Sequence, residues 1–461
     1  MKHTKAKRLL AAVFTAVTLL ASGCGNTIEP NDELRSAEQQ ESTVQTDAPT
    51  EDPAQTASAP EGAPQPETTT TDTQKPDETK PEETKKDDSS AGKDKDKDKT
   101  AETTAPEEVL PPKPQRTGSA TFHLTCAGDN LIHDNIFVEA WNKGGDHYDF
   151  SGMYDEIKPY LAKADIAILN QETVVNDAFP ASTYPVFSTP TEDGDAVVDV
   201  GFNVISMCNN HVLDKGSKGL ISSLDYWDSK PVVHYGAYRN EADSENIRTM
   251  TANGVIVAFL GYMEHTNGIF LSDNDDGKVV YLNETEKIKK QIKKARQIAD
   301  VVVVSCHFGT EVEHPINAQQ AELAPKLAEW GADLIIGTQA HCVSKCEYVE
   351  GSNGRKAFCY YGLGNFFHTM YDKCSAAGIL GDLDITCNFE TGDVSFSNIK
   401  AIPTISHFEA DSYDSMWYNC KVFPLAKYTD AQFARNYNDG VTRDSVMECL
   451  SCISDEYLSI E

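Results

Sequence analysis

Short apolar runs that end in polar side chains alternate along this chain with helical patterns. The most strand-like run covers residues 301–305 and leads directly into Cys306 and His307. Other runs lie at 121–126, 165–169, 203–207, 254–260, 333–336 and 357–361, and helical patterns occur at 153–164, 218–227, 284–299 and 318–330. Several runs are nearly continuous in Val and Ile, which is typical of strands covered on both faces. The alternation predicts an α/β layered fold with its functional site at the carboxyl ends of strands.

Five of these runs end in side chains that can bind a divalent cation. They are Gly128-Asp129, Asn170-Gln171-Glu172, Asn209-Asn210-His211, His307-Phe308-Gly309-Thr310-Glu311 and Gly337-Thr338-Gln339-Ala340-His341. Strand ends at one edge of a sheet converge in space, and carboxylate, amide and imidazole groups are common metal ligands. The pattern predicts a metal centre, although Glu172 alone could equally accept backbone donors at a strand end. His133 could be a second ligand or a surface histidine.

The segment Asn209-Asn210-His211 could combine a metal ligand with a neighbouring catalytic group. An asparagine carbonyl can ligate a hard cation while the neighbouring histidine donates a proton or holds an anionic transition state. Two further side chains, Glu311 and His314, could line the same pocket or pair with each other.

The N-terminus is typical of an exported protein. Basic residues fill positions 2–8, residues 9–21 carry no charge, and small residues follow up to Cys24. This is the pattern of a signal peptide over residues 1–23, and the apolar stretch is too short to span a membrane. Residues 20–24 also resemble the lipobox of bacterial lipoproteins, which implies acylation of Cys24. We therefore expect an extracytoplasmic protein anchored by lipid to the bacterial cell membrane, with plain secretion as the alternative.

The rest of the chain divides into three parts by composition. Residues 24–117 are rich in Thr, Pro, Glu, Asp and Lys and poor in aromatic residues, which predicts a disordered tether. Residues 118–405 are long enough for one large α/β domain. Hairpin-like runs at 379–389 and 393–402 precede an extension, 406–461, in which residues 429–454 show a weak helical pattern.

Charge and cysteine content limit the partners of this chain. It has 72 Asp and Glu against 40 Lys and Arg, a net charge of −32. Such a surface repels nucleic acids and anionic lipid, so a polyanionic substrate would need a bridging cation. Of 12 cysteines, eleven remain if Cys24 is acylated, and their pairing cannot be deduced. Four flank the motifs, as small buried residues or as thiolate ligands: Cys126, Cys208, Cys306 and Cys342.

Together with Tyr361-Gly362-Leu363-Gly364-Asn365-Phe366, these motifs resemble the bacterial capsule-synthesis proteins of the poly-γ-glutamate CapA type over about residues 121–367. That family is similar to the calcineurin-like metallophosphatases. The resemblance implies a four-layer fold, in which a two-sheet sandwich is flanked by helices around a two-metal site. It implies that the metal ligands are Asp129, Glu172, Asn210, His307 and His341. It further implies that His211 is the acid or transition-state contact and that Asn365 orients the pocket floor. Further candidates to line the pocket are Asn170, Asn209, Glu311, Gln339 and His133.

One position departs from the family pattern, because Gln339 stands where a histidine is usual. A glutamine carbonyl is a poorer ligand for zinc than imidazole, but it suits harder ions. We therefore expect one or two ions of manganese, magnesium or zinc. Two functions remain open: a capsule-synthesis factor that holds a capsular polyanion, within a capsule-synthesis membrane complex, or a metal-dependent phosphoesterase or hydrolase unrelated to capsule.

Overall fold

The computed structural model describes residues 113–413, 415–438 and 440–460, all within the compact unit Pro106–Glu461. The predicted signal peptide, Cys24 and nearly all of the predicted tether lie outside the described residues. No helix in the described part is both long and apolar enough to cross a membrane. The division into a domain of 118–405 and an extension of 406–461 stays a prediction.

The first sheet has eight strands and is centred on β1. Its order is β16-β15-β14-β1-β2-β3-β4, and β13 also pairs with β1. The strands β1 to β4 run parallel, whereas β14, β15 and β16 join in antiparallel fashion. The bounds are β1 Ser119–Asn130, β2 Ile166–Gln171, β3 Val204–Ser206, β4 Val233–Tyr235, β13 Asn365–Phe367, β14 Ala377–Asn388, β15 Val394–Glu409 and β16 Tyr418–Pro424.

The second sheet has six strands in the order β11-β12-β10-β9-β7-β6, and its four central strands are parallel. The bounds are β6 Arg248–Ala252, β7 Val255–Met263, β9 Val301–Phe308, β10 Leu334–Gln339, β11 Cys346–Glu350 and β12 Lys356–Tyr360. A two-stranded sheet is formed by β5 Ala237–Tyr238 and β8 Lys278–Val279.

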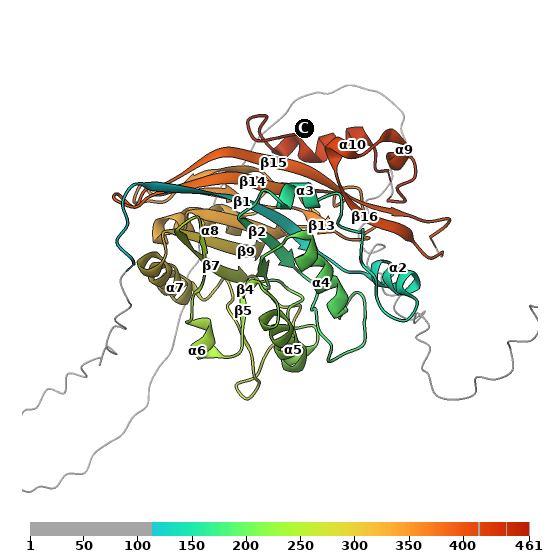
Figure 1. The fold of residues 1–461 in the computed structure, drawn as a ribbon, viewed down its shortest axis with the longest axis horizontal. Helices are drawn as coiled ribbons and strands as arrows, with labels where there is room; N and C mark the ends of the chain where they lie inside the picture. The colour runs from blue at the N-terminus through green and yellow to red at the C-terminus, as the bar shows by residue number, and fades with distance from the viewer. Residues whose placement is uncertain (1–112, 414, 439, 461) are drawn as a thin grey trace, which may run out of the picture. The chain divides into compact units, whose positions relative to one another are not determined.

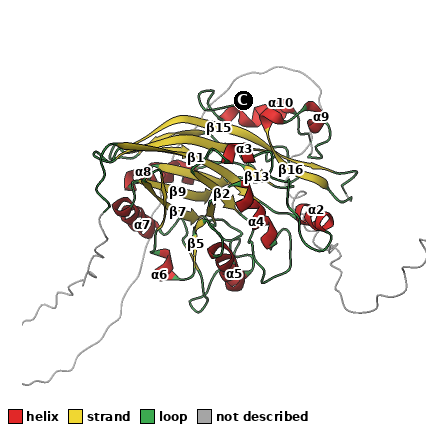
Figure 2. Ribbon diagram, viewed as in Figure 1, coloured by secondary structure: helices red, strands yellow, loops and turns green. Residues whose placement is uncertain are grey.

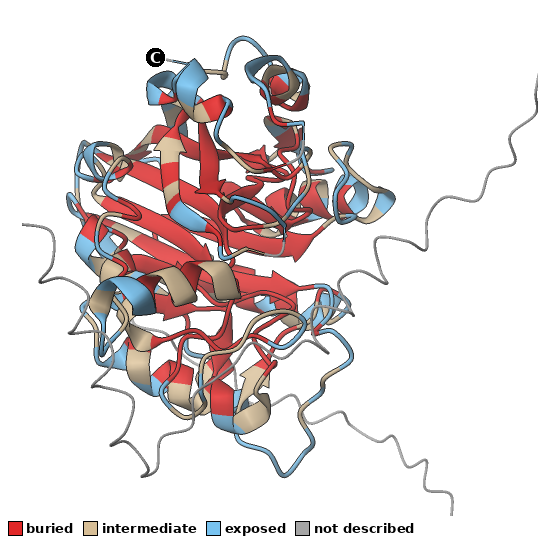
Figure 3. Cartoon of the chain, turned by 90° about the vertical axis from the view of Figure 1, so that its right-hand side faces the viewer, coloured by how far each residue is buried: buried red, intermediate tan, exposed pale blue. Residues whose placement is uncertain are grey.

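The core lies between the two sheets. Alternate residues of β1, such as Phe122 and Leu124, pack in one cluster with Val301 and Val303 of β9 and with Leu334 of β10. Side chains of β1 and β9 that point the other way pack against helices. The strands in the middle of the molecule are therefore buried on both faces, as Figure 3 shows in red.

Helices cover the outer face of each sheet. The outer face of the first sheet is covered by α2 Asp134–Gly144, α3 Lys158–Leu161, α4 Thr191–Val200 and α5 Gly216–Asp228. The second sheet is covered by α7 Thr285–Ile298 and α8 Ala318–Trp330. The remaining helices are α6 Glu241–Ser244, α9 Asp430–Phe433, α10 Arg443–Cys449 and the 3-10 turns η1 Leu425–Lys427 and η2 Leu450–Cys452. The predicted two-sheet sandwich flanked by helices is confirmed, whereas its assignment to the calcineurin-like metallophosphatase type stays a prediction (Figures 1 and 2).

One predicted helix, 153–164, is largely wrong. Most of this stretch forms turns, and only the four residues Lys158–Leu161 are helical. Pro159 lacks the backbone N–H, so it is tolerated only in a helix's first turn, and the observed helix accordingly begins at Lys158. The helices α2 and α4 were not predicted, although α2 carries apolar residues at helical spacing, with Ile136, Phe137 and Ala140 buried.

Candidate metal centre

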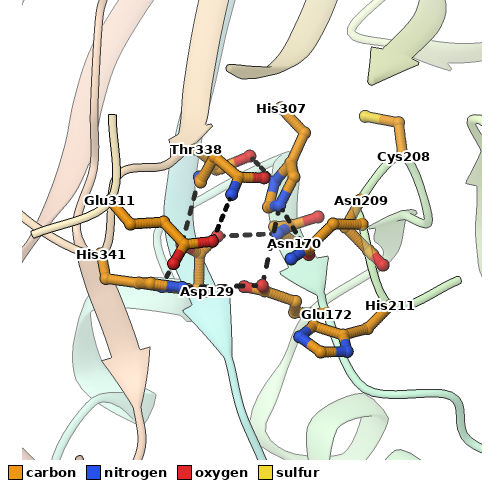
Figure 4. Close-up of polar contacts among 12 residues, drawn as sticks. Asp129, Asn170, Glu172, Cys208, Asn209, His211, His307, Glu311, Thr338 and His341 are labelled. Carbon is orange, nitrogen blue, oxygen red and sulfur yellow. Dashed lines mark hydrogen bonds and ion pairs between the residues drawn. The ribbon is translucent and has the colours of Figure 1, made fainter. Parts of the chain in front are cut away.

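The predicted ligands meet where the ends of strands from both sheets come together. Asp129 ends β1 and Glu172 follows β2, whereas His307 belongs to β9 and His341 follows β10 (Figure 4). Two parallel pairings, β1 with β2 and β9 with β10, bring these ends into register. The centre is therefore assembled from both layers of the sandwich.

The backbone at Asp129 is positioned by a close approach that only glycine permits. The Asp129 amide donates to the carbonyl of Gly364 at 3.1 Å. A Cβ at Gly128 would overlap that same carbonyl oxygen. This explains the Gly-Asp pair, since the glycine lets β1 contact the 363–365 turn and thereby fixes the aspartate's place.

Three buried side chains form the tightest set of ligand atoms in the described residues. One ligand atom each from Asp129, Glu172 and His341 lie within 4.8 Å of one another. The His341 Nδ1 is 3.2 Å from Asp129 Oδ2, and its Nε2 is 4.0 Å from Glu172 Oε1. The backbone of His341 (φ 56°) and that of Gln339 (φ 96°) are left-handed, which strains residues with a Cβ. Strain of this kind is common where side chains are held for function.

The oxygens of Glu172 fit a cation. Both are buried, and neither has a hydrogen-bond partner in the described residues. Burial, followed by the nearby charge of Asp129, raises the pKa of the Glu172 carboxyl well above its usual value. The amide oxygens of Asn170, Asn209 and Gln339 are likewise buried and unpaired. Buried oxygens are normally satisfied by donors or by metal ions, so this set matches the donor chemistry of a divalent-cation site.

His341 and Asp129 form a charged pair. Burial lowers the pKa of His341, but the charges of Glu172 and Asp129 outweigh it and raise that pKa to about 10. For Asp129, burial works in the opposite direction and is outweighed by the His341 contact, so its pKa is lowered. The Asn365 Oδ1 lies 2.9 Å from His341 Nδ1, which places the predicted floor residue in contact with the triad. Asn170 donates to Asp129 Oδ1 at 2.7 Å.

His307 is held as a neutral ring between two partners. Burial is the main cause that lowers its pKa to about 3. The Nε2 lies 3.0 Å from the Asn210 Oδ1 and 3.6 Å from Glu172 Oε1, and the Nδ1 lies 2.8 Å from the Thr338 hydroxyl. Because a hydroxyl can donate or accept, Thr338 can accept a hydrogen bond from the Nδ1–H group, which leaves Nε2 with a lone pair for a cation.

His211 is oriented by a carboxylate. The Nδ1 of His211 lies 2.8 Å from Asp214 Oδ2, which also accepts from the Phe187 amide at 2.7 Å. The Asn267 amide nitrogen is 3.3 Å from the same Nδ1. Figure 4 shows the His211 ring next to Glu172. A histidine fixed by a carboxylate at one nitrogen can present the other to a bound group.

Gln339 and Glu311 contact each other. The Gln339 Nε2 donates to Glu311 Oε1 at 2.9 Å, and the Gln339 backbone amide donates to Asp129 Oδ2 at 3.3 Å. The alternative pairing of Glu311 with His314 is not what the structure shows, because the His314 Nδ1 contacts the Val343 carbonyl at 2.7 Å. Asn209 donates to the Gln171 carbonyl at 2.9 Å.

His133 is a buried residue and not a surface histidine. It is 8% exposed, and burial is the first cause that lowers its pKa to about 4. Its Nδ1 accepts from the Thr369 amide at 3.3 Å. The four cysteines near the motifs are buried free thiols, and burial raises the pKa of each. This favours their interpretation as small packing residues, because a metal ligand would have to be a thiolate.

Sequence reasoning missed Thr338 and Asn267. The role of Thr338 follows from the register that sets it opposite His307 in neighbouring strands. Asn267 lies on a loop after β7, where it also accepts from the Asn210 side chain at 3.3 Å. Thr338 lies within the motif that ends at His341, but nothing in that motif predicts its contact with His307, and no local motif marks Asn267.

Comparisons with known proteins agree with the motifs. Residues 123–370 match the family model described as "Bacterial capsule synthesis protein PGA_cap". The capsule biosynthesis protein CapA of Bacillus anthracis is 28% identical over 270 residues, 56% of this chain and 62% of that protein. The PGA biosynthesis protein CapA of Bacillus subtilis (strain 168) is 30% identical over 260 residues, 55% of this chain and 65% of that protein. The chain thus matches less than two thirds of either relative's length.

Two solved structures are also similar. A phosphatase from Mycoplasma pneumoniae has a TM-score of 0.39 and 13% identity, covering 62% of this chain and 94% of its own. A 5′-nucleotidase from Candida albicans SC5314 has a TM-score of 0.33 and 10% identity, covering 61% of this chain and 51% of its own. Both TM-scores are below 0.5.

Proposed function

The chain belongs to the family of bacterial capsule synthesis proteins described as PGA_cap, and from this premise we propose that it helps to make, export or tether an anionic capsular polymer of the poly-γ-glutamate type. It would act through a divalent cation held by Asp129, Glu172, His341, His307 and Asn210. We place the protein outside the cytoplasm, anchored to the membrane through Cys24, with secretion as the alternative, and its partners would include a capsule-synthesis membrane complex.

The observation that carries this proposal is the pair of buried, unpaired oxygens of Glu172 beside the Asp129 carboxylate. Two adjacent carboxylates in a buried place are mutually repulsive, and a cation between them removes that repulsion. Their oxygen-rich surroundings, with amide oxygens from Asn170, Asn209 and Gln339, favour manganese or magnesium over zinc.

Charge explains why a cation is needed for this class of polymer. The chain has a net charge of −32, so carboxylates of a polyanion are repelled from its surface. When bound, a divalent cation supplies a positive charge that attracts a carboxylate or phosphoryl oxygen. Buried side chains of the protein orient that oxygen, and His211, fixed by Asp214, can hold or donate a proton beside it.

The test measures metal content and polymer binding together. The full chain is dialysed against manganese, magnesium or zinc, its metal content is determined, and binding of poly-γ-glutamate is followed with and without chelator. We expect manganese-dependent binding that Asp129→Asn weakens at least tenfold, whereas the matched control Asp273→Asn, an exposed aspartate, leaves it unchanged. Polymer binding that persists in chelator would contradict the proposal.

A metal-dependent phosphoesterase is the second candidate, and the His211–Asp214 contact favours it. A carboxylate-oriented histidine is what protonation of a leaving group requires. The assay uses generic phosphomonoesters and diesters with manganese, and turnover should disappear in His211→Ala. Turnover without polymer binding would select this function over the capsular one.

A further inference from the structure

Five cysteines lie on segments that pack around the C-terminal helices, and one of them, Cys342, directly follows the proposed ligand His341. Cys342 and Cys346 follow β10, Cys374 follows β13, Cys449 ends α10 and Cys452 ends η2. All eleven cysteines of the described residues are free thiols.

The loop 371–375 packs directly against the C-terminal segment. The rings of Tyr371 and Tyr437 have centroids 5.7 Å apart, and the Asn438 side chain donates to the Asp372 carbonyl at 3.0 Å. The Cys449 Sγ lies 3.8 Å from the Lys373 carbonyl oxygen. Three consecutive residues of the loop are therefore in contact with the segment that carries Cys449, and the next residue in the loop is Cys374. Figure 1 shows α9 and α10 in red beside β15.

The two C-terminal thiols point to different neighbours. Whereas Cys449 approaches residue 373, the Cys452 Sγ lies 3.3 Å from the Val343 carbonyl and 3.4 Å from the Cys449 carbonyl. Cys374 is the first neighbouring charge that raises the pKa of Cys449, after burial. The contact of Cys449 with the carbonyl of Lys373, the residue before Cys374, points to Cys374 as its partner.

A metal site does not account for these thiols. In the part of the chain that the structure describes, the set of three ligand atoms within 4.8 Å is Asp129, Glu172 and His341, and no thiol belongs to it. Tetrahedral sites for zinc need four ligands at about 2.3 Å from the ion, which is a tighter gathering.

We propose that Cys374 and Cys449 form a disulfide that fastens α10 to the loop after β13. The oxidant is a low-molecular-weight disulfide, such as oxidised glutathione. Cys374, which is only half-buried, loses its proton to solvent, and its sulfur attacks one sulfur of the oxidant, which breaks that S–S bond and releases one small thiol. Cys449 then loses its proton and attacks the Cys374 sulfur, which releases the second small thiol. Two protein thiols are oxidised and one small disulfide is reduced.

The cross-link would close a loop of about 75 residues that contains β14, β15 and β16. Closing so long a loop restricts the unfolded chain, so the oxidised protein should melt at a higher temperature by roughly 5 to 10 °C. The loop 371–375 follows β13, whose first residue, Asn365, contacts His341. The cross-link would therefore also fasten a segment that supports the metal centre.

The test maps thiols in the full chain after incubation with oxidised glutathione. Free thiols are blocked under denaturing conditions, and the peptides are analysed with and without reduction. We expect one cross-linked peptide pair that contains Cys374 and Cys449. Blocking of both thiols before reduction, or linkage of Cys374 to Cys342 or Cys452, would overturn the proposal.

A second measurement compares melting with and without reductant. The reductant should lower the melting temperature of the wild type but not that of Cys374→Ser or Cys449→Ser. The matched control is Cys452→Ser, a thiol in the same segment, which should keep the response of the wild type. A wild-type melting temperature that reductant leaves unchanged, with the oxidised peptides mapped as free, refutes the cross-link.

Discussion

Replacing Glu172 by glutamine should change stability in opposite directions with and without metal. In the metal-free protein both Glu172 oxygens are buried without partners beside the charge of Asp129. Because burial and the charge of Asp129 raise the pKa of Glu172, folding must either protonate this carboxylate or bury its charge. Glutamine removes that cost, so the metal-free variant should be more stable by about 1 to 3 kcal/mol. Glutamine keeps the shape of the side chain, so packing is little changed.

Metal should no longer stabilise this variant. A cation at about 100 times its dissociation constant stabilises the folded wild type by about 2.7 kcal/mol. For a domain of this size that free energy raises the melting temperature by about 5 °C. Because Glu172 supplies ligand atoms to the buried triad, Glu172→Gln should lose most of this increase.

The assay is thermal unfolding of the full chain with chelator and with increasing manganese. The matched control is Glu322→Gln, since Glu322 is exposed and should respond to manganese as the wild type does. Equal stabilisation of wild type and Glu172→Gln by manganese would refute the reasoning. So would a metal-free variant that is less stable than the wild type by more than about 2 kcal/mol.

Three further predictions concern other parts of the structure. Contacts with Asp382 and Asp384 raise the pKa of His123 to about 9 despite burial, so they stabilise the fold fully below about pH 6.5 and this stabilisation is lost as the pH rises through 9. The variant His123→Asn should therefore lower the free energy of unfolding, measured with urea, by about 1 to 2 kcal/mol at pH 6 and by little at pH 10. Thr338→Val removes the hydroxyl that contacts His307 Nδ1, so manganese affinity measured by calorimetry should fall about tenfold, and unchanged affinity would argue against His307 as a ligand. Gln339→His should raise the number of metal ions bound per protein chain, as measured by metal analysis. An unchanged number of ions per chain would mean that residue 339 does not face the second metal position of a two-metal site.

The fold was largely predictable because buried parallel strands leave a strong local signal. The Val-rich run before His307 is β9, and the apolar run before Gly337 is β10. Each of these two strands needs apolar residues on both faces, and few other kinds of secondary structure place four β-branched apolar residues in succession. The predicted helix at 153–164 was wrong because Pro159 lies in the middle of it, where it is not tolerated despite the helical apolar pattern.

The candidate site was predictable as a set of strand ends but not as a geometry. Parallel pairing explains why Asp129 and Glu172 come together, and that rule applies within one sheet. It does not say that β9 and β10 of the other sheet bring their histidines to the same place, which depends on how the sheets pack. The partners Thr338 and Asn267 depend on register and on a loop, so no sequence pattern identifies them.

Because the two carboxylates come from one sheet and the two histidines from the other, the order of synthesis matters. A ribosome delivers Asp129 and Glu172 long before it delivers His307 and His341. A nascent chain that stops before β10 has acidic groups but no His341, and it cannot complete the triad. Tight uptake of a cation would therefore mark the moment at which the two halves of the sandwich have closed on each other.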